Sequence, residues 1–444
     1  MKNQSAQPDL LRDPVSRVFL SYLAPSVSAT LVTSIYILAD TMMIGRGIGA
    51  VGIAALNILL PLYSGYFGIG MLCGVGGSVL FGFSKGRGDE KEARRYFTSA
   101  FLMAAFLAAA AFFGSRIFFE PLLSLLGNTP SMNDCSVPYG KVLATAAPLF
   151  VFSSFLQAFV RNDGAPKLAM VGVISGGVTN VILDYVYIFI MGWGMAGAAL
   201  ATATGTTLTV LILSTHFFSP ENHLKLDFSL GRTALRKMTE IFASGLSSLI
   251  LEVSGGIVML LFNRQLLSYV GDMGVVVYGI ISNTALVVTS ISNGIAQASQ
   301  PLLSTNFGAG NRERILQARG LALRVAMAAG IVFAALGMLF PVPLSYLFLE
   351  PTEEILVMAV PAIRLYFLGF LVSVRNVICG TYFQSMVQPK YALLITLLRG
   401  VVLNSVLVFL LPAVLGVDGI WLTVTVSEFI TAAVAWHLLR KEKN

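Results

Sequence analysis

Long apolar stretches separated by short polar clusters run through almost the whole chain. Residues 47–84, 185–220 and 273–311 contain no Asp, Glu, Lys or Arg. A helix needs about 20 apolar residues to cross a hydrocarbon core of roughly 30 Å. Each of these stretches is therefore long enough for most of two membrane-spanning helices, or for one long helix and a loop.

Dividing the apolar stretches at glycines, prolines and charge clusters predicts twelve transmembrane helices. The strict alternation that marks a membrane β-barrel is absent from the sequence. The pattern thus predicts an all-α polytopic membrane protein with twelve transmembrane helices in two six-helix bundles. We place the helices at about 16–41, 50–82, 95–119, 139–161, 167–191, 195–217, 239–267, 275–306, 315–340, 357–384, 391–412 and 416–438.

Composition agrees with a membrane protein and excludes several functional classes. Only 11% of the 444 residues are charged, against about 25% in soluble proteins. Hydrophobic residues make up 56% of the chain. These values exclude a soluble enzyme, a nucleic-acid-binding protein and a disordered scaffold. Three scattered cysteines and three histidines argue against a disulfide framework and against a metal site.

The net charge of +7 reflects basic residues that set the orientation of the chain in the membrane, and it does not indicate an acidic partner. Most basic residues fall on every second loop and at the two termini, whereas the opposite loops carry acids. Under the positive-inside rule, both termini are therefore predicted to be cytoplasmic. No cleavable signal peptide is predicted, and we expect a multi-pass protein of the bacterial inner (plasma) membrane. The predicted cytoplasmic bases include Lys85, Arg87, Arg161, Lys225, Arg232, Arg312, Lys390, Arg399 and Lys441, and the opposite acids include Glu120, Asp272, Glu350 and Asp418.

The sequence repeats itself at an offset of 222–223 residues. Gly86 matches Gly308, Pro166 matches Pro389, and Gly194 matches Gly416, in the same order in both halves. An even number of helices in each half means that the two halves have the same orientation. We predict an N-terminal lobe at 1–217, a cytoplasmic linker at 218–238 and a C-terminal lobe at 239–444. Transporters built this way bind substrate between the halves.

Ionisable residues inside the predicted helices of the first half indicate a cation site. Burying such a group in a membrane costs at least about 2.5–3.5 kcal/mol, so each one suggests a function. Asp40 ends a polar stripe, and Asn180 lies one turn before Asp184, at a comparable depth. Two acids and an amide at one level suit a proton or cation site, because burial favours the neutral or ion-paired form of a carboxyl group. The alternative is that each acid only reaches the outer interface. The stripe consists of Ser26, Thr30, Thr33, Tyr36 and Asp40, and the second helix face consists of Gly172, Gly176, Asn180 and Asp184.

The second half carries a different polar set. Glu252 and Glu428 are predicted near mid-membrane, either with a function or with a structural hydrogen bond inside the bundle. Arg364 and Arg375 are their candidate partners, although Arg375 is better placed to reach the cytoplasmic interface. The eighth helix is rich in amides where the first half has Met71 and Val75. Its polar face includes Ser290, Asn293, Gln297, Gln300 and Ser304.

Several local stretches resemble the multidrug and toxic compound extrusion (MATE) family, and the bacterial MepA-like branch in particular. They include residues 40–45 at the end of the first helix, residues 161–167 between the fourth and fifth helices, and residues 180–185. In the second half, Gln300-Pro301 and the 308–311 stretch are similar to the end of the family's eighth helix. Together with the two six-helix lobes, the resemblance covers nearly the whole chain.

The resemblance implies an antiporter in which H+ or Na+ enters while lipophilic, often cationic drugs leave. It implies that Asp40, Asn180 and Asp184 form the cation-coupling site, with Thr202 and Tyr139 as further members. The tenth helix here has no acid, which tilts the expectation toward H+. We assign the substrate cavity to Glu252, Asn293, Gln297, Gln300 and Met71, and we expect no cofactor, no resident metal and a functional monomer.

Three other functions remain to be weighed. A lipid-linked oligosaccharide flippase of the same superfamily would need several bases in its cavity, and few deep bases are predicted. A membrane-embedded enzyme would need a clustered catalytic set, such as paired Asp motifs, which the sequence lacks. A channel is disfavoured because the acids do not form a ring. No phosphate-binding Walker sequence supports ATP-driven transport.

Overall fold

A computed structural model describes residues 8–229, 233–347 and 351–442, and within these ranges it contains helices and no strands. This outcome follows from the apolar sequence, because a helix satisfies its own backbone hydrogen bonds where no water is available. The predicted linker is therefore described only in part. Arg232 and Glu350, which entered the topology prediction, lie outside the described residues.

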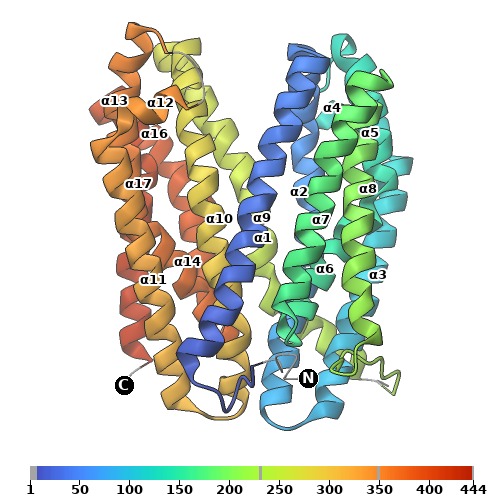
Figure 1. Cartoon of the computed structure of the whole chain (residues 1–444). Helices are drawn as coiled ribbons and strands as arrows, with labels where there is room; N and C mark the ends of the chain where they lie inside the picture. The colour runs from blue at the N-terminus through green and yellow to red at the C-terminus, as the bar shows by residue number, and fades with distance from the viewer. Residues whose placement is uncertain (1–7, 230–232, 348–350, 443–444) are drawn as a thin grey trace, which may run out of the picture. The chain divides into compact units, whose positions relative to one another are not determined.

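The first half contains long helices and several short ones (Figure 1). α2 and α3 meet at a tight turn, and the side chain of Asp89 accepts a hydrogen bond from the backbone of Glu92 to cap α3. The elements are α1 (Val15–Gly47), α2 (Ala50–Gly86), α3 (Glu90–Ile117), α4 (Phe119–Leu125), α5 (Asn133–Thr145), α6 (Ala147–Asn162), α7 (Pro166–Asp184) and α8 (Gly194–Ser214), with short turns η1 (Pro130–Met132), η2 (Tyr185–Ile190) and η3 (Thr215–Phe218).

The second half repeats this order with different lengths. α17 packs against α13, α14 and α16. The elements are α9 (Thr233–Val270), α10 (Asp272–Gly308), α11 (Arg312–Leu339), α12 (Pro341–Tyr346), α13 (Glu353–Phe367), α14 (Phe370–Ser385), α15 (Pro389–Leu397), η4 (Leu398–Val402), α16 (Leu403–Leu415) and α17 (Val417–Lys441).

Among the described residues, ten helices are long and apolar enough to cross a membrane, and two bent helix pairs raise the number to twelve. The bent pairs replace the predicted helices at 139–161 and 357–384. One bends by 54° between α5 and α6, and the other by 40° between α13 and α14. The breaks at Ala146 and Gly369 lie 223 residues apart, so they occupy equivalent positions of the repeat. The internal repeat therefore extends to where its helices bend.

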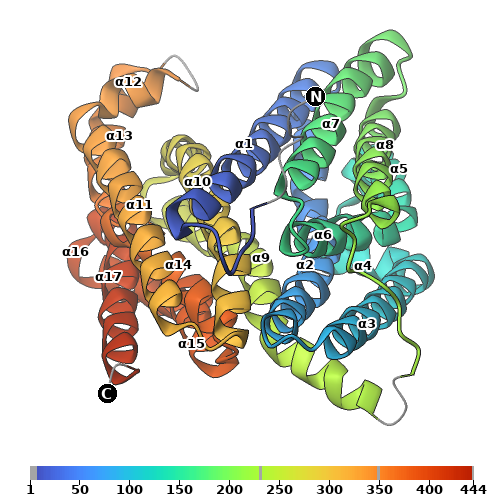
Figure 2. The same ribbon diagram turned by 60° about the horizontal axis from the view of Figure 1, so that its bottom comes forward.

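The chain divides into two compact units, and each is described here by itself. The first unit contains residues 1–253 and 304–312, and the second contains residues 254–303 and 313–444. In the first unit, α7 packs between α1 and α8, and α5 lies on the far side of α8 (Figures 1 and 2). α2 packs against α3 and α6. These five neighbouring helices, α1, α2, α6, α7 and α8, surround the site described below.

The ends of α2 and α10 cross closely within the first unit. A Cβ atom added to Gly86 would lie 1.9 Å from the backbone oxygen of Thr305, and one added to Gly308 would lie 1.9 Å from that of Phe83. Gly86 and Gly308 are equivalent in the repeat, and so are Phe83 and Thr305. The two contacts are therefore related by the internal symmetry of the sequence, and both require the absence of a side chain.

The turn that precedes α15 preserves the repeat despite a change of residue. Gly164 before α7 has φ of 99°, and the equivalent Val387 before α15 has φ of 54°. A β-branched residue in this left-handed region is strained. The backbone of the turn is thus maintained in both halves, which confirms the offset of 223 in this part of the sequence.

Candidate functional site

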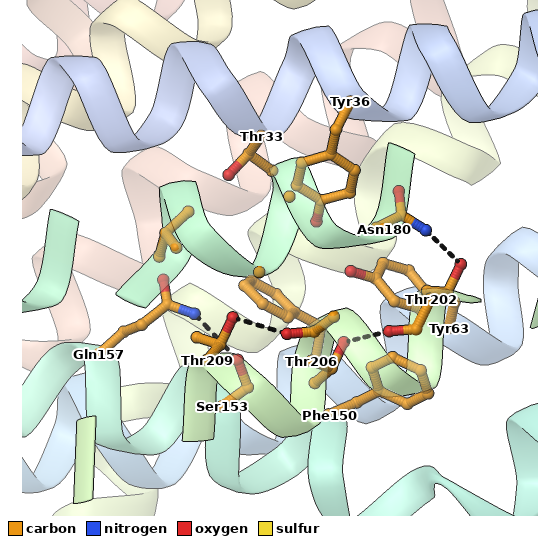
Figure 3. A pocket seen from close by; sticks show the side chains of 15 residues that line it. Thr33, Tyr36, Tyr63, Phe150, Ser153, Gln157, Asn180, Thr202, Thr206 and Thr209 are labelled. Atoms are coloured by element: carbon orange, nitrogen blue, oxygen red, sulfur yellow. Dashed lines mark hydrogen bonds between the residues drawn. The ribbon is translucent and has the colours of Figure 1, made fainter. Parts of the chain in front are cut away.

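A small polar cavity lies among α1, α2, α6, α7 and α8 of the first unit (Figure 3). Its volume is about 40 Å³. A single water needs about 10–15 Å³ measured in this way, so the cavity accommodates a few waters or a small cation but no drug-sized molecule. Its polar lining consists of Thr33, Tyr36, Tyr63, Ser153, Gln157, Asn180, Thr202, Thr206 and Thr209.

Close packing of α7 against α8 forms one wall of the cavity. A Cβ atom on Gly176 would lie 2.6 Å from the backbone oxygen of Gly205, so only glycine allows this approach. The Thr209 hydroxyl donates to the backbone oxygen of Gly172 across the same interface, at 3.1 Å. The glycine spacing in the fifth predicted helix therefore serves helix packing.

Asn180 of α7 and Thr202 of α8 link the two helices that form this wall. The Asn180 side-chain amide donates to the Thr202 hydroxyl at 3.2 Å (Figure 3). Thr202 in turn donates to the backbone oxygen of Ala198 at 3.1 Å. Asn180 is 2% exposed. The Asn180 side-chain oxygen is buried and has no hydrogen-bond partner, so it is free to accept a proton donor or a cation.

Asp184 is fully buried one turn beyond Asn180 and is the last residue of α7. Both of its carboxyl oxygens lack a hydrogen-bond partner, and so does Oδ1 of Asp40. The two carboxyl groups nevertheless interact electrostatically with each other. Two ionised carboxylates in this setting would be costly, and a shared proton or a bound cation removes that cost.

The helix changes its geometry directly after Asp184. Residues Tyr185–Ile190 form a π-helical turn, η2, which is wider than an α-helix. Such turns are rare and are found frequently at functional sites. The acid that the sequence singled out therefore lies at the junction between two helix types.

Tyrosine hydroxyls surround the two acids. Tyr139 of α5 is buried and interacts with Thr202, Asp40 and Asp184. Tyr36 interacts electrostatically with Asp40 and with Tyr63. The structure thus brings together all the residues that the sequence assigned to cation coupling: Asp40, Tyr139, Asn180, Asp184 and Thr202.

The polar stripe predicted from the sequence included Thr33 and Tyr36, but sequence reasoning missed the hydroxyl and amide groups that α2, α6 and the rest of α8 contribute to the cavity. Gln157 donates to the Ser153 hydroxyl at 3.2 Å, and Thr206 donates to the backbone oxygen of Thr202 at 2.8 Å. Tyr63 also belongs to this set. The available signal was the threonine-rich stretch 202–209, whose members recur at helical spacing.

The residues assigned to the substrate cavity fall in both units. Glu252 and Met71 belong to the first unit, where Glu252 lies beside Gly68 of α2 and interacts electrostatically with Tyr63. Asn293, Gln297 and Gln300 lie on α10 in the second unit. Gln300 is 2% exposed. The assignment of these residues to drug binding stays a prediction.

A larger and mostly apolar cavity lies between α2, α3 and α4 in the first unit. Its volume is about 390 Å³, within the range of small-molecule sites. Two of its lining residues, Tyr66 and Ser115, have their hydroxyl oxygens 2.5 Å apart. None of the residues assigned to the substrate cavity lines it.

Two expectations about charges in the second half were wrong. Glu428 pairs with neither Arg364 nor Arg375, since Nη2 of Arg399 lies 2.8 Å from its Oε1. Arg399, which the sequence placed with the cytoplasmic bases, has a side chain only 15% exposed and bonded inside the helix bundle. Its position near the start of the eleventh helix suggested an interface, but the fold turns it toward α17.

A second cluster surrounds Asp163 in the turn between α6 and α7. Its fully buried carboxylate accepts from Lys85 Nζ at 3.0 Å and from the backbone N–H of His223 at 2.8 Å. The rings of His216 and His223 lie 2.9 Å and 3.0 Å from it. Burial by itself raises the pKa of Asp163, but these histidines and Lys85 together hold that pKa below its usual value. The cluster ties the start of the linker to the ends of α2 and α6.

Comparison with known proteins identifies the same architecture elsewhere. The multidrug export protein MepA of Staphylococcus aureus is 24% identical over 436 residues, which cover 97% of this chain and 95% of that protein. MepA of Staphylococcus saprophyticus is also 24% identical, with the same coverage. A solved structure described as the outward-facing conformation of a multidrug resistance MATE family transporter of the MOP superfamily has a TM-score of 0.91 at 22% identity, covering 99% of this chain and 98% of that chain.

The family match repeats the division of the chain into halves. The MatE family model matches residues 25–186 and 245–410. One segment falls in each predicted lobe, and together they cover most of the sequence. The similar proteins are transporters and not enzymes. The chain belongs to the MatE family.

Proposed function

We propose that the protein is a secondary active multidrug efflux antiporter that exports lipophilic, often cationic drugs in exchange for H+. Relatives named multidrug export proteins over 97% of the chain support the substrate class. In this proposal the protein is a functional monomer in the bacterial plasma membrane, with both termini cytoplasmic, and alternates access to the two sides.

The observation that carries the coupling proposal is the buried pair Asp40 and Asp184. Asp184 has no hydrogen-bond partner on either carboxyl oxygen, and Asp40 interacts with it electrostatically. Protonation of the pair removes the repulsion, and deprotonation restores it. A site with these properties converts the arrival and departure of a proton into a change in packing between α1 and α7, which are in contact.

The small size of the neighbouring cavity separates the two ligands of the antiporter. About 40 Å³ suits a water-bound proton or a small cation, so the drug is bound elsewhere in the molecule. Na+ is the alternative coupling ion, since the oxygens of Asn180 and Asp184 are of the type that it prefers. No observation favours a flippase, and the buried base Arg399 is already neutralised by Glu428.

The test is transport of a fluorescent lipophilic cation in proteoliposomes under an imposed pH or Na+ gradient. We expect a pH gradient to drive wild-type transport and a Na+ gradient alone to fail. Asp184→Asn and Asp40→Asn should each reduce gradient-driven transport by at least tenfold. Asp134→Asn, at an exposed position, is the matched control and should transport like wild type. Undiminished transport by both site variants would overturn the coupling proposal, and transport driven by Na+ alone would replace H+ as the coupling ion.

A further inference from the structure

The second half of the chain contains a buried ion pair at the positions where the first half has its cavity. Asn376 lies 13 residues before Pro389, as Ser153 lies 13 before Pro166. Arg399 lies 10 residues after Pro389, as Gly176 lies 10 after Pro166. Glu428 and Thr206 each lie 12 residues after a repeat glycine, Gly416 and Gly194 respectively. Ser153, Gly176 and Thr206 all line the cavity of the first half.

The contacts of this ion pair form a closed polar network within the second unit. Arg399 Nη2 donates to Glu428 Oε1 at 2.8 Å and to the Ser373 hydroxyl at 3.2 Å. The Ser373 hydroxyl donates to Glu428 Oε1 at 3.0 Å. The Asn376 amide donates to Glu428 Oε2 at 2.7 Å. Each oxygen of the Glu428 carboxylate is therefore bound, unlike those of Asp184.

The backbone around Arg399 is shaped to bring this side chain inward. Arg399 belongs to the π-helical turn η4, Leu398–Val402, and its backbone oxygen accepts from the Asn404 side chain at 2.6 Å. The equivalent residue of the first half is Gly176, which lines the cavity and whose missing side chain lets α7 approach α8 closely. The second half therefore carries a guanidinium group where the first half carries no side chain.

We propose that Arg399 is a built-in cation that occupies the second-half counterpart of the small polar cavity, so that only the first half exchanges a coupling ion. The second part of this proposal rests on the function proposed above. The proposal predicts that, once the guanidinium group is removed, Glu428, Asn376 and Ser373 form a binding site for a small monovalent cation. The pair is thus a reason for single-site coupling in a protein made of two similar halves.

If Arg399 fills a cation-sized site, the position that it vacates should accept a small cation and exclude a large one. The first experiment therefore measures the unfolding temperature of purified Arg399→Ala with millimolar guanidinium chloride, NaCl or tetramethylammonium chloride. Leaving Glu428 buried without its partner should lower the unfolding temperature by roughly 5–10 °C. Guanidinium should restore at least half of the loss, whereas tetramethylammonium, which is too large for the vacated position, should restore none. Equal responses to guanidinium and tetramethylammonium would overturn the proposal.

Two further variants keep the test decisive if Arg399→Ala folds poorly. Arg399→Ala/Glu428→Gln removes both charges. We expect this double variant to be more stable than Arg399→Ala, and we expect guanidinium to leave its unfolding temperature unchanged. A guanidinium response as large in this double variant as in Arg399→Ala would count against a site at Glu428. Arg324→Ala is the matched control and should show no response, because Arg324 is an exposed residue of α11 whose Nε donates to the backbone oxygen of Gly320.

The second experiment separates this inference from the proposed function. The folded Arg399→Ala/Glu428→Gln variant should keep pH-driven transport within about twofold of wild type. Loss of that transport would show that the second half takes part in coupling and would overturn the inference. Retained transport in Asp184→Asn would overturn the first-half coupling site instead, and the stability results would still report on Arg399 alone.

Discussion

At the scale of single residues, buried acids in this protein have two different surroundings. Asp163 and Glu428 are each bound by basic side chains and by further donors. No ion pair among the described residues involves Asp184, and the group with which it interacts most strongly is another acid, Asp40. A buried charge that is fully bound holds structure together, whereas one without partners is available to a mobile ion. Hydrogen bonding therefore separates the structural acids from the proposed coupling acid more clearly than burial does.

The Asp163 cluster predicts how stability depends on pH. Because the pKa of Asp163 is lower in the folded protein, the cluster stabilises the fold above the unfolded pKa of about 3.9. That contribution is lost as the pH falls through the lowered folded pKa. Asp163→Asn should lower the unfolding temperature by several degrees at pH 7, because hydrogen bonds to a charged group contribute about 1.5–3 kcal/mol each.

The measurement is thermal unfolding of wild type and Asp163→Asn from pH 8 down to pH 3. The difference between the two proteins should shrink as the pH falls from about 5 to 3, because protonation of Asp163 removes its contribution. Asp134→Asn supplies the background for titration of the other acids. A difference that grows on acidification would contradict the predicted sign.

Residue chemistry was readable from the sequence where a polar group interrupts an apolar helix. Asp40, Asn180 and Asp184 stand out for that reason, and the structure places them together. The pairing of Arg399 with Glu428 was not readable, because it depends on the direction in which η4 turns a side chain. The sequence shows how far along a helix a residue lies better than it shows which neighbouring helix its side chain faces.

At the scale of elements, irregular turns occur where the polar groups lie. The π-helical turns η2 and η4 follow Asp184 and contain Arg399, respectively. The bends at Ala146 and Gly369 divide the fourth and tenth spans. Hydropathy predicted these spans as continuous, because a bend changes direction without changing how apolar the residues are.

The crossing of α2 and α10 predicts which glycines tolerate a methyl group. Gly86→Ala and Gly308→Ala each place a Cβ atom against a backbone oxygen, so we expect each to destabilise the protein by about 1–3 kcal/mol. Gly114→Ala is the matched control, since nothing lies within 4 Å of its added Cβ and alanine favours a helix. Thermal unfolding of the purified variants checks this. Wild-type stability in both Gly86→Ala and Gly308→Ala would show that the crossing is looser than described.

At the scale of the whole molecule, the distribution of basic residues predicts the orientation in the membrane. Single cysteines introduced at Ser131, Glu221 and Lys441, which are all exposed, report on the loops and the C-terminus. In a background without Cys73, Cys135 and Cys379, a membrane-impermeant maleimide should label Cys at 131 in intact cells. Cysteines at 221 and 441 should react only after the membrane is opened. Labelling of position 441 in intact cells would contradict a cytoplasmic C-terminus.

By itself, the sequence determined the all-helical membrane fold, the repeat of two halves and the residues that interrupt the apolar helices. These properties depend on local composition and spacing, because a bilayer penalises every exposed backbone group and every isolated charge. The tertiary structure decided which polar groups meet. It brought Asp40 and Asp184 together from helices far apart in the sequence, and it paired the Glu428 carboxylate with Arg399. The physical reason is that contacts between helices depend on facing direction and on bends, which local spacing does not encode.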